Sequence, residues 1–149
     1  MAAIYSENSL VGTWKLLSRE DMTARGERRI DPILGGNPLA YLMYDGAGHF
    51  AVQFMKRDRG TVEAQAGAPM SGSGNSSAWL GYDAYFGRYR VEEAGTVTQE
   101  LIGALSPRDV GKVVTRRFQI NGNDLAIELE TMASDGEPVT RTLRWQRVA

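Results

Sequence analysis

Hydrophobic and polar residues alternate along short segments of this chain, with the period of two that is typical of β-strands. The clearest pair of segments covers residues 39–44 and 49–55. Between them, residues 45–48 read Asp-Gly-Ala-Gly, and the glycines can adopt the positive φ that a tight hairpin needs. Segments rich in alternating, aromatic and β-branched residues predict six further strands, at residues 10–20, 85–92, 96–102, 113–120, 125–132 and 139–148.

Most of these predicted strands are separated by short turns that contain Gly, Asn or Asp. A meander of this kind can close on itself and so remove its exposed edges. We therefore expect an all-β fold, an eight-stranded up-and-down antiparallel β-barrel with at most short helical turns. A chain of 149 residues has room for one such domain, over residues 1–149.

Three connecting segments lack the strand pattern. Residues 21–37 are polar and contain Pro32, which predicts a long loop. Residues 60–78 consist largely of Gly, Ala and Ser, and this composition predicts either a flexible lid or a disordered loop. Residues 77–84 begin with a serine that can cap a helix, and we expect a short helical turn there.

Composition excludes several classes of function. The 17 Lys and Arg nearly balance the 18 Asp and Glu, so the net charge of −1 gives no electrostatic reason to expect a nucleic acid or a membrane as partner. The absence of cysteine excludes disulfides, thiolate metal ligands and cysteine nucleophiles. No run of about 18 apolar residues predicts a membrane span. We therefore expect a cytoplasmic protein, and leave open whether it forms a homodimer.

The spacing of Gly12 and Trp14 at the start of the first predicted strand resembles the lipocalins. More of the chain is similar to the bacterial and fungal lipocalin-like domain family, in segments 36–38 (Gly-Asn-Pro), 41–46, 50–55, 57–59, 85–89 (Tyr-Phe-Gly-Arg-Tyr) and 143–147 (Leu-Arg-Trp-Gln-Arg). This resemblance implies a calycin-type barrel that holds a small molecule. Relatives often carry a histidine near the middle of the fifth strand, where this chain has Gln99 and Glu100, so chemistry assigned to that histidine is not carried over.

The same resemblance implies a structural closure of the barrel. In lipocalins an arginine of the last strand packs across the first-strand tryptophan, which corresponds here to Trp14 with Arg147 or, as the second choice, Arg144. A guanidinium over an indole face contributes about 0.5–2 kcal/mol, and its other donors can bond loop carbonyls.

Residues that point into the barrel are the candidate binding residues, because side chains alternate between inside and outside along each strand. The alternation leaves open whether His49, Gln53 and Met55 or the opposite face of their strand is inside. Tyr85 and Tyr89 share an apolar face and are expected to point inward, where their hydroxyls need partners. The candidate ligand-binding set is Tyr41, Met43, His49, Gln53, Met55, Tyr85, Tyr89, Gln99, Arg116 and Phe118.

Arg116 is the strongest pointer to a ligand within this set. It shares a strand face with Val114, Phe118 and Ile120, so its charge needs a carboxylate, backbone carbonyls or an anionic ligand if that face is inside. Alternatively, Arg116 lies at the barrel mouth and reaches solvent.

These residues predict a protein that binds a small, mostly hydrophobic molecule carrying a carbonyl or acidic oxygen. The alternative is a cofactor-independent isomerase or cyclase, in which His49, Glu100 or Tyr89 moves a proton and Arg116 or Gln99 stabilises an oxyanion. A third class is a structural protein with a filled interior. Because the chain has one histidine, a histidine-rich metal site is excluded, a haem ligated by His49 is disfavoured, and we expect neither metal nor cofactor.

Overall fold

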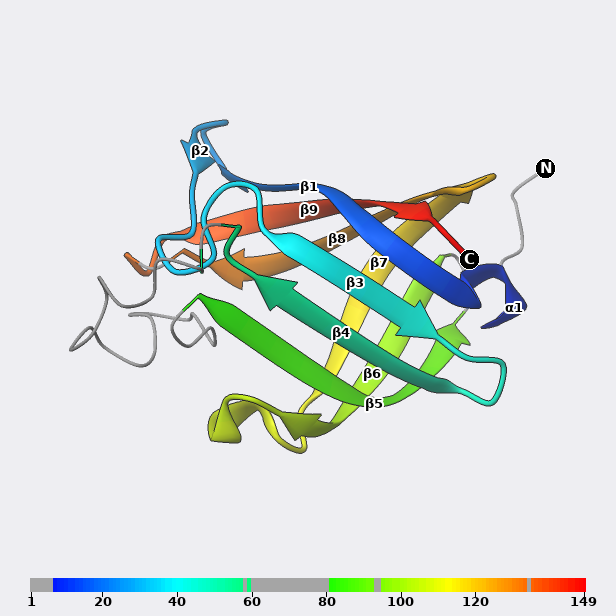
Figure 1. Ribbon diagram of the computed structural model, residues 1–149. Coiled ribbons are helices and arrows are strands. Elements are labelled where there is room, and N and C mark those ends of the chain that lie inside the picture. Colours follow the sequence, from blue (N-terminus) through cyan, green and yellow to red (C-terminus); the bar gives the residue numbers. More distant parts are fainter. Residues whose placement is uncertain (1–6, 58, 60–80, 93–94, 134) are drawn as a thin grey trace.

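The computed structural model describes residues 7–57, 59, 81–92, 95–133 and 135–149, so the predicted lid at residues 60–78 lies outside the described residues. The described part of the chain contains a four-residue helix, α1 (Glu7–Leu10), and a 3-10 turn, η2, at Pro107–Asp109. The strands are β1 (Gly12–Thr23), β2 (Arg28–Arg29), β3 (Leu39–Tyr44), β4 (His49–Met55), β5 (Tyr82–Glu92), β6 (Thr96–Ala104), β7 (Val113–Asn121), β8 (Asp124–Met132) and β9 (Pro138–Arg147), as Figure 1 shows.

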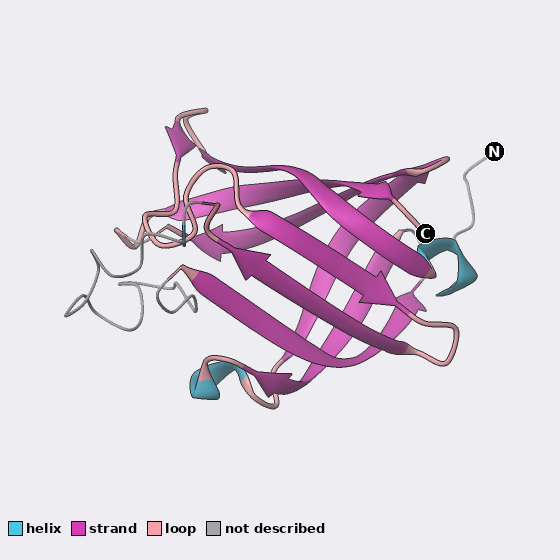
Figure 2. Ribbon diagram, in the orientation of Figure 1, coloured by secondary structure: helices cyan, strands magenta, loops and turns pink. Residues whose placement is uncertain are grey.

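The strands form one antiparallel meander in which each strand from β3 onward pairs with its neighbour in sequence (Figure 2). β1 pairs with both β3 and β9, and this second pairing closes the sheet into a barrel. Eight strands make up the barrel, since β2 is only a two-residue strand on the edge of β1. The predicted all-β, eight-stranded closed barrel is therefore confirmed.

Two strands extend furthest beyond the ends that the sequence pattern predicted. β1 continues to Thr23, inside the segment that was expected to be a loop, and pairs with β9 over that length. β5 begins at Tyr82, so the expected helical turn is wrong for residues 82–84, while residues 77–80 lie outside the described part. In both extensions polar residues point inward, and this hides the apolar alternation by which strands are recognised.

The two ends of the barrel differ in their connections (Figure 1). At one end, which we call the closed end, short turns at residues 45–48 and 122–123 join the strands, and α1 and the C-terminus lie beside them. At the other end, the open end, the connections at residues 24–38 and 105–112 are longer. The open end is therefore the end where loops can shape a site.

The turn between β3 and β4 shows how local sequence fixes the closed end. The Asp45 carboxylate accepts hydrogen bonds from the backbone N–H groups of Ala47 (2.9 Å) and His49 (2.8 Å). These hydrogen bonds lower the pKa of Asp45, and the bond from the His49 backbone has the largest effect. Gly48 has a φ of +91°, which favours glycine, as the sequence predicted for this hairpin.

Aromatic and aliphatic side chains fill the closed half of the barrel. Trp14 and Trp145 are almost fully buried, and Leu10 of α1 seals the same end. The Trp14 indole donates a hydrogen bond to the Leu10 carbonyl at 2.9 Å. Tyr44 packs edge-on against Tyr89, with ring centroids 4.6 Å apart.

The predicted contact between Trp14 and Arg147 is present at this end. The Arg147 guanidinium lies 4.3 Å from the Trp14 ring centroid. It also donates to the backbone carbonyls of Ser9 (3.1 Å) and Val11. Since Trp14 and Arg147 are partners in the β1–β9 ladder, this contact fastens the first strand and α1 to the last strand.

Candidate functional site

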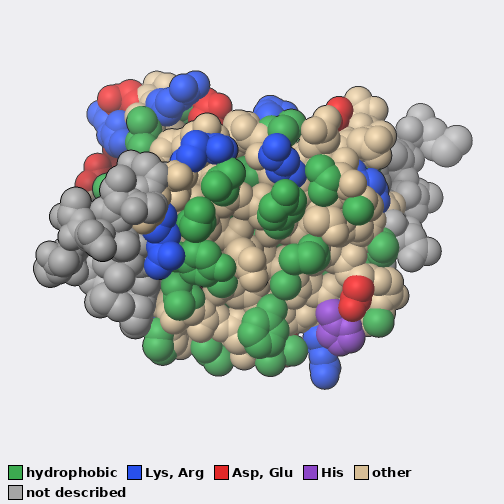
Figure 3. Space-filling model, in the orientation of Figure 1, with side chains coloured by type: hydrophobic (Ala, Val, Ile, Leu, Met, Phe, Trp, Pro, Cys, Tyr) green, Lys and Arg blue, Asp and Glu red, His purple; other side chains and the backbone are tan. Residues whose placement is uncertain are grey.

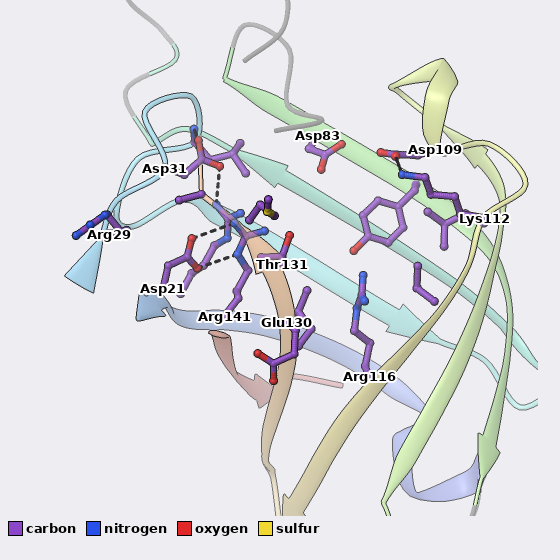
Figure 4. A pocket seen from close by; sticks show the side chains of 18 of the residues that line it. Asp21, Arg29, Asp31, Asp83, Asp109, Lys112, Arg116, Glu130, Thr131 and Arg141 are labelled. Atoms are coloured by element: carbon purple, nitrogen blue, oxygen red, sulfur yellow. Dashed lines mark hydrogen bonds and ion pairs between the residues drawn. The ribbon is translucent and has the colours of Figure 1, made fainter. Parts of the chain in front are cut away.

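A cavity of about 330 Å³ occupies the open half of the barrel (Figure 4). Its volume lies at the low end of the range of small-molecule sites. The loops at residues 29–34 and 108–112 form part of its rim. The strand residues that line it come from β1, β5, β6, β7, β8 and β9 and include Arg19, Asp21, Asp83, Tyr85, Leu101, Val114, Arg116, Leu129, Thr131 and Arg141.

Most charged groups around this cavity are already neutralised by a partner. Asp21 accepts two hydrogen bonds from Arg141, at 2.8 and 3.0 Å, and the pair joins β1 to β9 (Figure 4). On the rim, Lys112 donates to Asp109 at 2.8 Å. Burial lowers the pKa of Arg141, but the hydrogen bonds and charge of Asp21, together with Asp31 and Tyr85, raise it overall. Asp21 is therefore held in a fixed, bidentate pair.

Arg19 and Asp31 form a further pair that connects β1 to the loop before β3. Their closest atoms, Arg19 Nη1 and Asp31 Oδ2, are 3.3 Å apart, and both side chains are at most 9% exposed. Asp31 also accepts the backbone N–H of Ile33 at 2.8 Å, so it holds the loop against the barrel. Burial lowers the pKa of Arg19, and within the described residues its Nε has no hydrogen-bond partner.

Asp83 differs from these carboxylates because it makes no ion pair with any described residue. It points into the cavity from β5 (Figure 4) and takes a hydrogen bond from the backbone N–H of Ala84. Burial raises the pKa of Asp83 to about 6. The nearby Asp109 adds to this rise, while Arg19 and Arg141 oppose it. The cavity thus contains a carboxyl group that titrates close to neutral pH.

Arg116 is the cationic counterpart of Asp83. It extends from β7 into the cavity (Figure 4) and forms no ion pair with a carboxylate of the described residues. Its guanidinium makes a polar contact with the Tyr85 hydroxyl. Burial raises the pKa of Tyr85, while Arg116 acts in the opposite direction. Arg116 and Tyr85 are therefore together available to an oxygen atom of a ligand.

Of the predicted binding residues, the structure brings only Tyr85 and Arg116 to the cavity. Three others are buried in the closed half, and two of them are hydrogen-bonded within the protein. The Gln99 amide donates to the Tyr44 hydroxyl at 2.9 Å, and the Tyr89 hydroxyl donates to the Asp45 carbonyl at 2.7 Å. Phe118 is part of the apolar core.

The remaining predicted residues lie on the outer face of the barrel, which corrects their placement in the interior. Phe50, Val52 and Phe54 are buried, so the opposite face of β4 is outside. Figure 3 shows hydrophobic side chains exposed on the outer surface over these strands. The outward residues are Tyr41, Met43, His49, Gln53, Met55 and Glu100. The larger apolar side chains take the inside because their burial removes more apolar area from water.

The three candidates for proton transfer are likewise absent from the cavity. The His49 side chain is 58% exposed and lies 3.2 Å from Asp45 on the surface. Glu100 is exposed, and Tyr89 is bonded in the closed half. The cavity residues that sequence reasoning missed are chiefly Asp83, Arg19, Asp21 and Arg141.

The sequence held a usable signal for Asp83 but not for β1. Asp83 shares the period-two face of Tyr85 and Tyr89, so extending β5 by one repeat would have included it. In β1 a register shift between Leu16 and Ser18 turns Arg19 and Asp21 inward, and simple alternation from Trp14 would have placed them outside.

Neither metal-binding clusters nor membrane helices are found in the part of the chain that the structure describes. No group of three or more His, Cys, Asp or Glu side chains there could hold a metal ion. No described helix is long and apolar enough to cross a membrane.

Comparison with known proteins identifies a family to which the chain is similar. A family model described as a lipocalin-like domain matches residues 11–148, which span the whole barrel. No curated protein matches the chain.

Proposed function

This chain belongs to the lipocalin-like domain family, and from that premise we propose that it binds a small molecule through a carbonyl or acidic oxygen in the cavity of the open end. The barrel and the family are consistent with small-molecule binding. The chemistry of the ligand is inferred from the residues that line the cavity.

The observation that carries this proposal is the position of Arg116 beside Tyr85. A partly buried guanidinium without a carboxylate partner loses hydration, and an anionic or carbonyl oxygen of a ligand would restore its hydrogen bonds. The Tyr85 hydroxyl can donate to the same oxygen. Leu101, Val114 and Leu129 offer apolar surface next to these donors, which favours a ligand with a hydrophobic body.

The cavity also limits the size of the ligand. The closed half is filled by its own side chains, so the ligand occupies only the open half. The ion pairs Asp21–Arg141 and Arg19–Asp31 form the polar part of the cavity wall. A compact ring carrying one oxygen-bearing group suits this space better than a long lipid chain.

Benzoate is a suitable probe, because it combines a flat apolar ring with a carboxylate. Titration into the wild-type chain, followed by NMR, should shift backbone signals of Arg116 and of β5 residues near Tyr85. Arg116→Met should weaken binding by roughly 10- to 100-fold, since a hydrogen bond to a charged group contributes about 1.5–3 kcal/mol. Tyr85→Phe removes one oxygen only and should weaken binding less.

His49→Ala is the matched control, because His49 lies on the outer face and should leave benzoate binding unchanged. Benzyl alcohol, which lacks the carboxylate, should bind more weakly than benzoate. Equal affinities of wild type and Arg116→Met would overturn the proposal. Native mass spectrometry of protein isolated from its own host would then identify the natural ligand by mass.

Several predictions from the sequence stay predictions. They concern a cytoplasmic location, the absence of nucleic-acid and membrane partners, and the absence of a cofactor, while the question of a homodimer stays open.

A further inference from the structure

We propose that the open-end cavity also catalyses proton transfer next to a carbonyl group, with Asp83 as the base and Arg116 and Tyr85 holding the oxygen that becomes negative. This inference rests on the proposed binding function and adds a chemical step to it. It replaces the three proton-transfer candidates that the structure places outside the cavity.

Most charged side chains of the cavity form ion pairs within the protein. Asp21, Asp31 and Asp109 each face a cation at hydrogen-bonding distance. Among the described carboxylates that point into the cavity, this leaves Asp83 without an ion pair. Arg116 is in the same position among the cations, as far as the described residues show.

A base and an oxyanion site are thus both present and do not neutralise each other. The reason lies in their placement. Tyr85 contacts Arg116, whereas the charged groups that act on Asp83 are Asp109, Arg19 and Arg141.

The second argument is the spacing along β5. Asp83 and Tyr85 are two residues apart on the same inward face, so their Cα atoms are about 6.6 Å apart. Arg116 reaches Tyr85 from β7, which is separated from β5 by β6 alone. A ligand whose carbonyl oxygen is held by Arg116 and Tyr85 can therefore present the carbon next to its carbonyl group to Asp83. That carbon is only two bonds away from the carbonyl oxygen.

The third argument is the proton affinity of the base. Burial has the largest effect and raises the pKa of Asp83, and four groups from different elements also shift this pKa. Asp109 of η2 raises its pKa, while Arg19 of β1, Arg141 of β9 and the Ala84 backbone N–H lower it. The net pKa of about 6 keeps Asp83 ionised at neutral pH and more basic than an ordinary carboxylate, which suits a general base.

The reaction needs no other reactant. Asp83 takes a proton from the carbon next to the carbonyl, so the C–H bond breaks and an O–H bond forms on the carboxylate. The electron pair of the C–H bond moves to the carbonyl oxygen, which becomes an enolate held by Arg116 and Tyr85. Asp83 then returns the proton to a different carbon, and the product is an isomer of the substrate.

The probe is 3-cyclohexen-1-one, a ring ketone small enough for the cavity. Loss of a proton at C2 and its return at C4 gives the conjugated 2-cyclohexen-1-one, which is followed by its ultraviolet absorbance. The full-length wild-type chain should convert the probe faster than buffer. Its rate should increase as pH rises through about 6, because Asp83 must be ionised to act.

Asp83→Asn should lower the turnover by about 100-fold or more, because general-base catalysis contributes factors of that order. The variant retains the shape of the side chain and should bind benzoate at least as tightly as the wild type, because it removes a negative charge that repels the benzoate carboxylate. Retained binding shows that the variant is folded. Tyr85→Phe should lower kcat more than it changes KM if the hydroxyl stabilises the enolate. Asp124→Asn, which removes an exposed carboxylate at the closed end, is the matched control and should have wild-type turnover.

Two results would overturn proton transfer while leaving binding intact. One is a wild-type rate equal to that of buffer, with benzoate binding that still depends on Arg116. The other is equal turnover by wild type and Asp83→Asn. Loss of the Arg116 dependence of benzoate binding would instead overturn the proposed function itself.

Discussion

The two halves of this barrel are built from the same strands but bury opposite kinds of side chain. The closed half holds Trp14, Trp145 and Leu125, each almost fully buried among other apolar groups. The open half holds charged side chains such as Asp21 and Arg141 around a cavity. Strand alternation alone therefore does not decide whether the interior is a core or a site. The chemical type of the inward residue decides it.

The two halves also contribute differently to stability and to function. Apolar burial in the closed half contributes directly to folding, at about 25 cal/mol per Å². In the open half each buried charge loses hydration, and its ion pair offsets that loss only if both partners are present. Residues of an active or binding site often reduce stability in this way.

The largest loss of stability is expected from a substitution that creates a cavity in the closed half. Trp14→Ala removes a fully buried indole, its hydrogen bond to Leu10 and the surface on which Arg147 packs. We expect the free energy of unfolding to fall by about 4 kcal/mol. Urea denaturation measures it, with Phe86→Ala on the exposed outer face as control. A loss below about 1 kcal/mol would contradict the description of this half as the stabilising core.

Breaking a charge pair in the open half should have the next largest effect. Asp21→Asn leaves the Arg141 guanidinium buried beside a neutral partner, and we expect a loss of about 3 kcal/mol in the free energy of unfolding. Replacing both residues at once, as Asp21→Leu with Arg141→Met, should recover most of this loss, because no charge then stays unpaired. A double variant as unstable as the single one would show that the pair itself, and not the orphaned charge, supplies the stability.

Asp83→Asn should have the opposite effect to Asp21→Asn and should stabilise the protein, because it removes a buried negative charge. Its pKa rises from 3.8 to about 6 on folding, so the folded state binds the proton more tightly than the unfolded state. Stability of the wild type therefore falls as pH rises through this window, whereas Asp83→Asn does not titrate. We expect the variant to be more stable by roughly 3 kcal/mol at about pH 8, with the difference vanishing near about pH 4.

Urea denaturation across this pH range checks the sign of the Asp83 effect. A variant less stable than wild type at high pH would mean that the ionised carboxylate has a partner that stabilises it.

The smallest effect is expected on the outer face. His49→Ala removes an exposed side chain whose neighbour is the exposed Asp45, so stability should change by less than about 0.5 kcal/mol. Benzoate binding and turnover of the ketone should also match the wild type. A change in either would place a ligand contact outside the cavity and weaken the distinction between the two halves.

The sequence by itself determined the architecture and the closure. Period-two alternation and turn residues predicted eight strands, because each strand and each hairpin is a local structure that neighbouring residues dictate. Trp14 and Arg147 followed from a resemblance, and the β1–β9 pairing brings them together. Tyr85 and Arg116 were also predicted, since each lies on a face whose other members are apolar.

Only the tertiary structure decided what occupies the interior. A bulge between Leu16 and Ser18 reverses the faces of β1 and turns Arg19 and Asp21 inward, and one extra residue of this kind leaves no mark in the hydrophobic pattern. Burial then sets the proton affinity of Asp83, a property that arises from the groups of distant strands around it. The barrel is thus encoded locally, whereas its cavity depends on contacts between residues far apart in the chain.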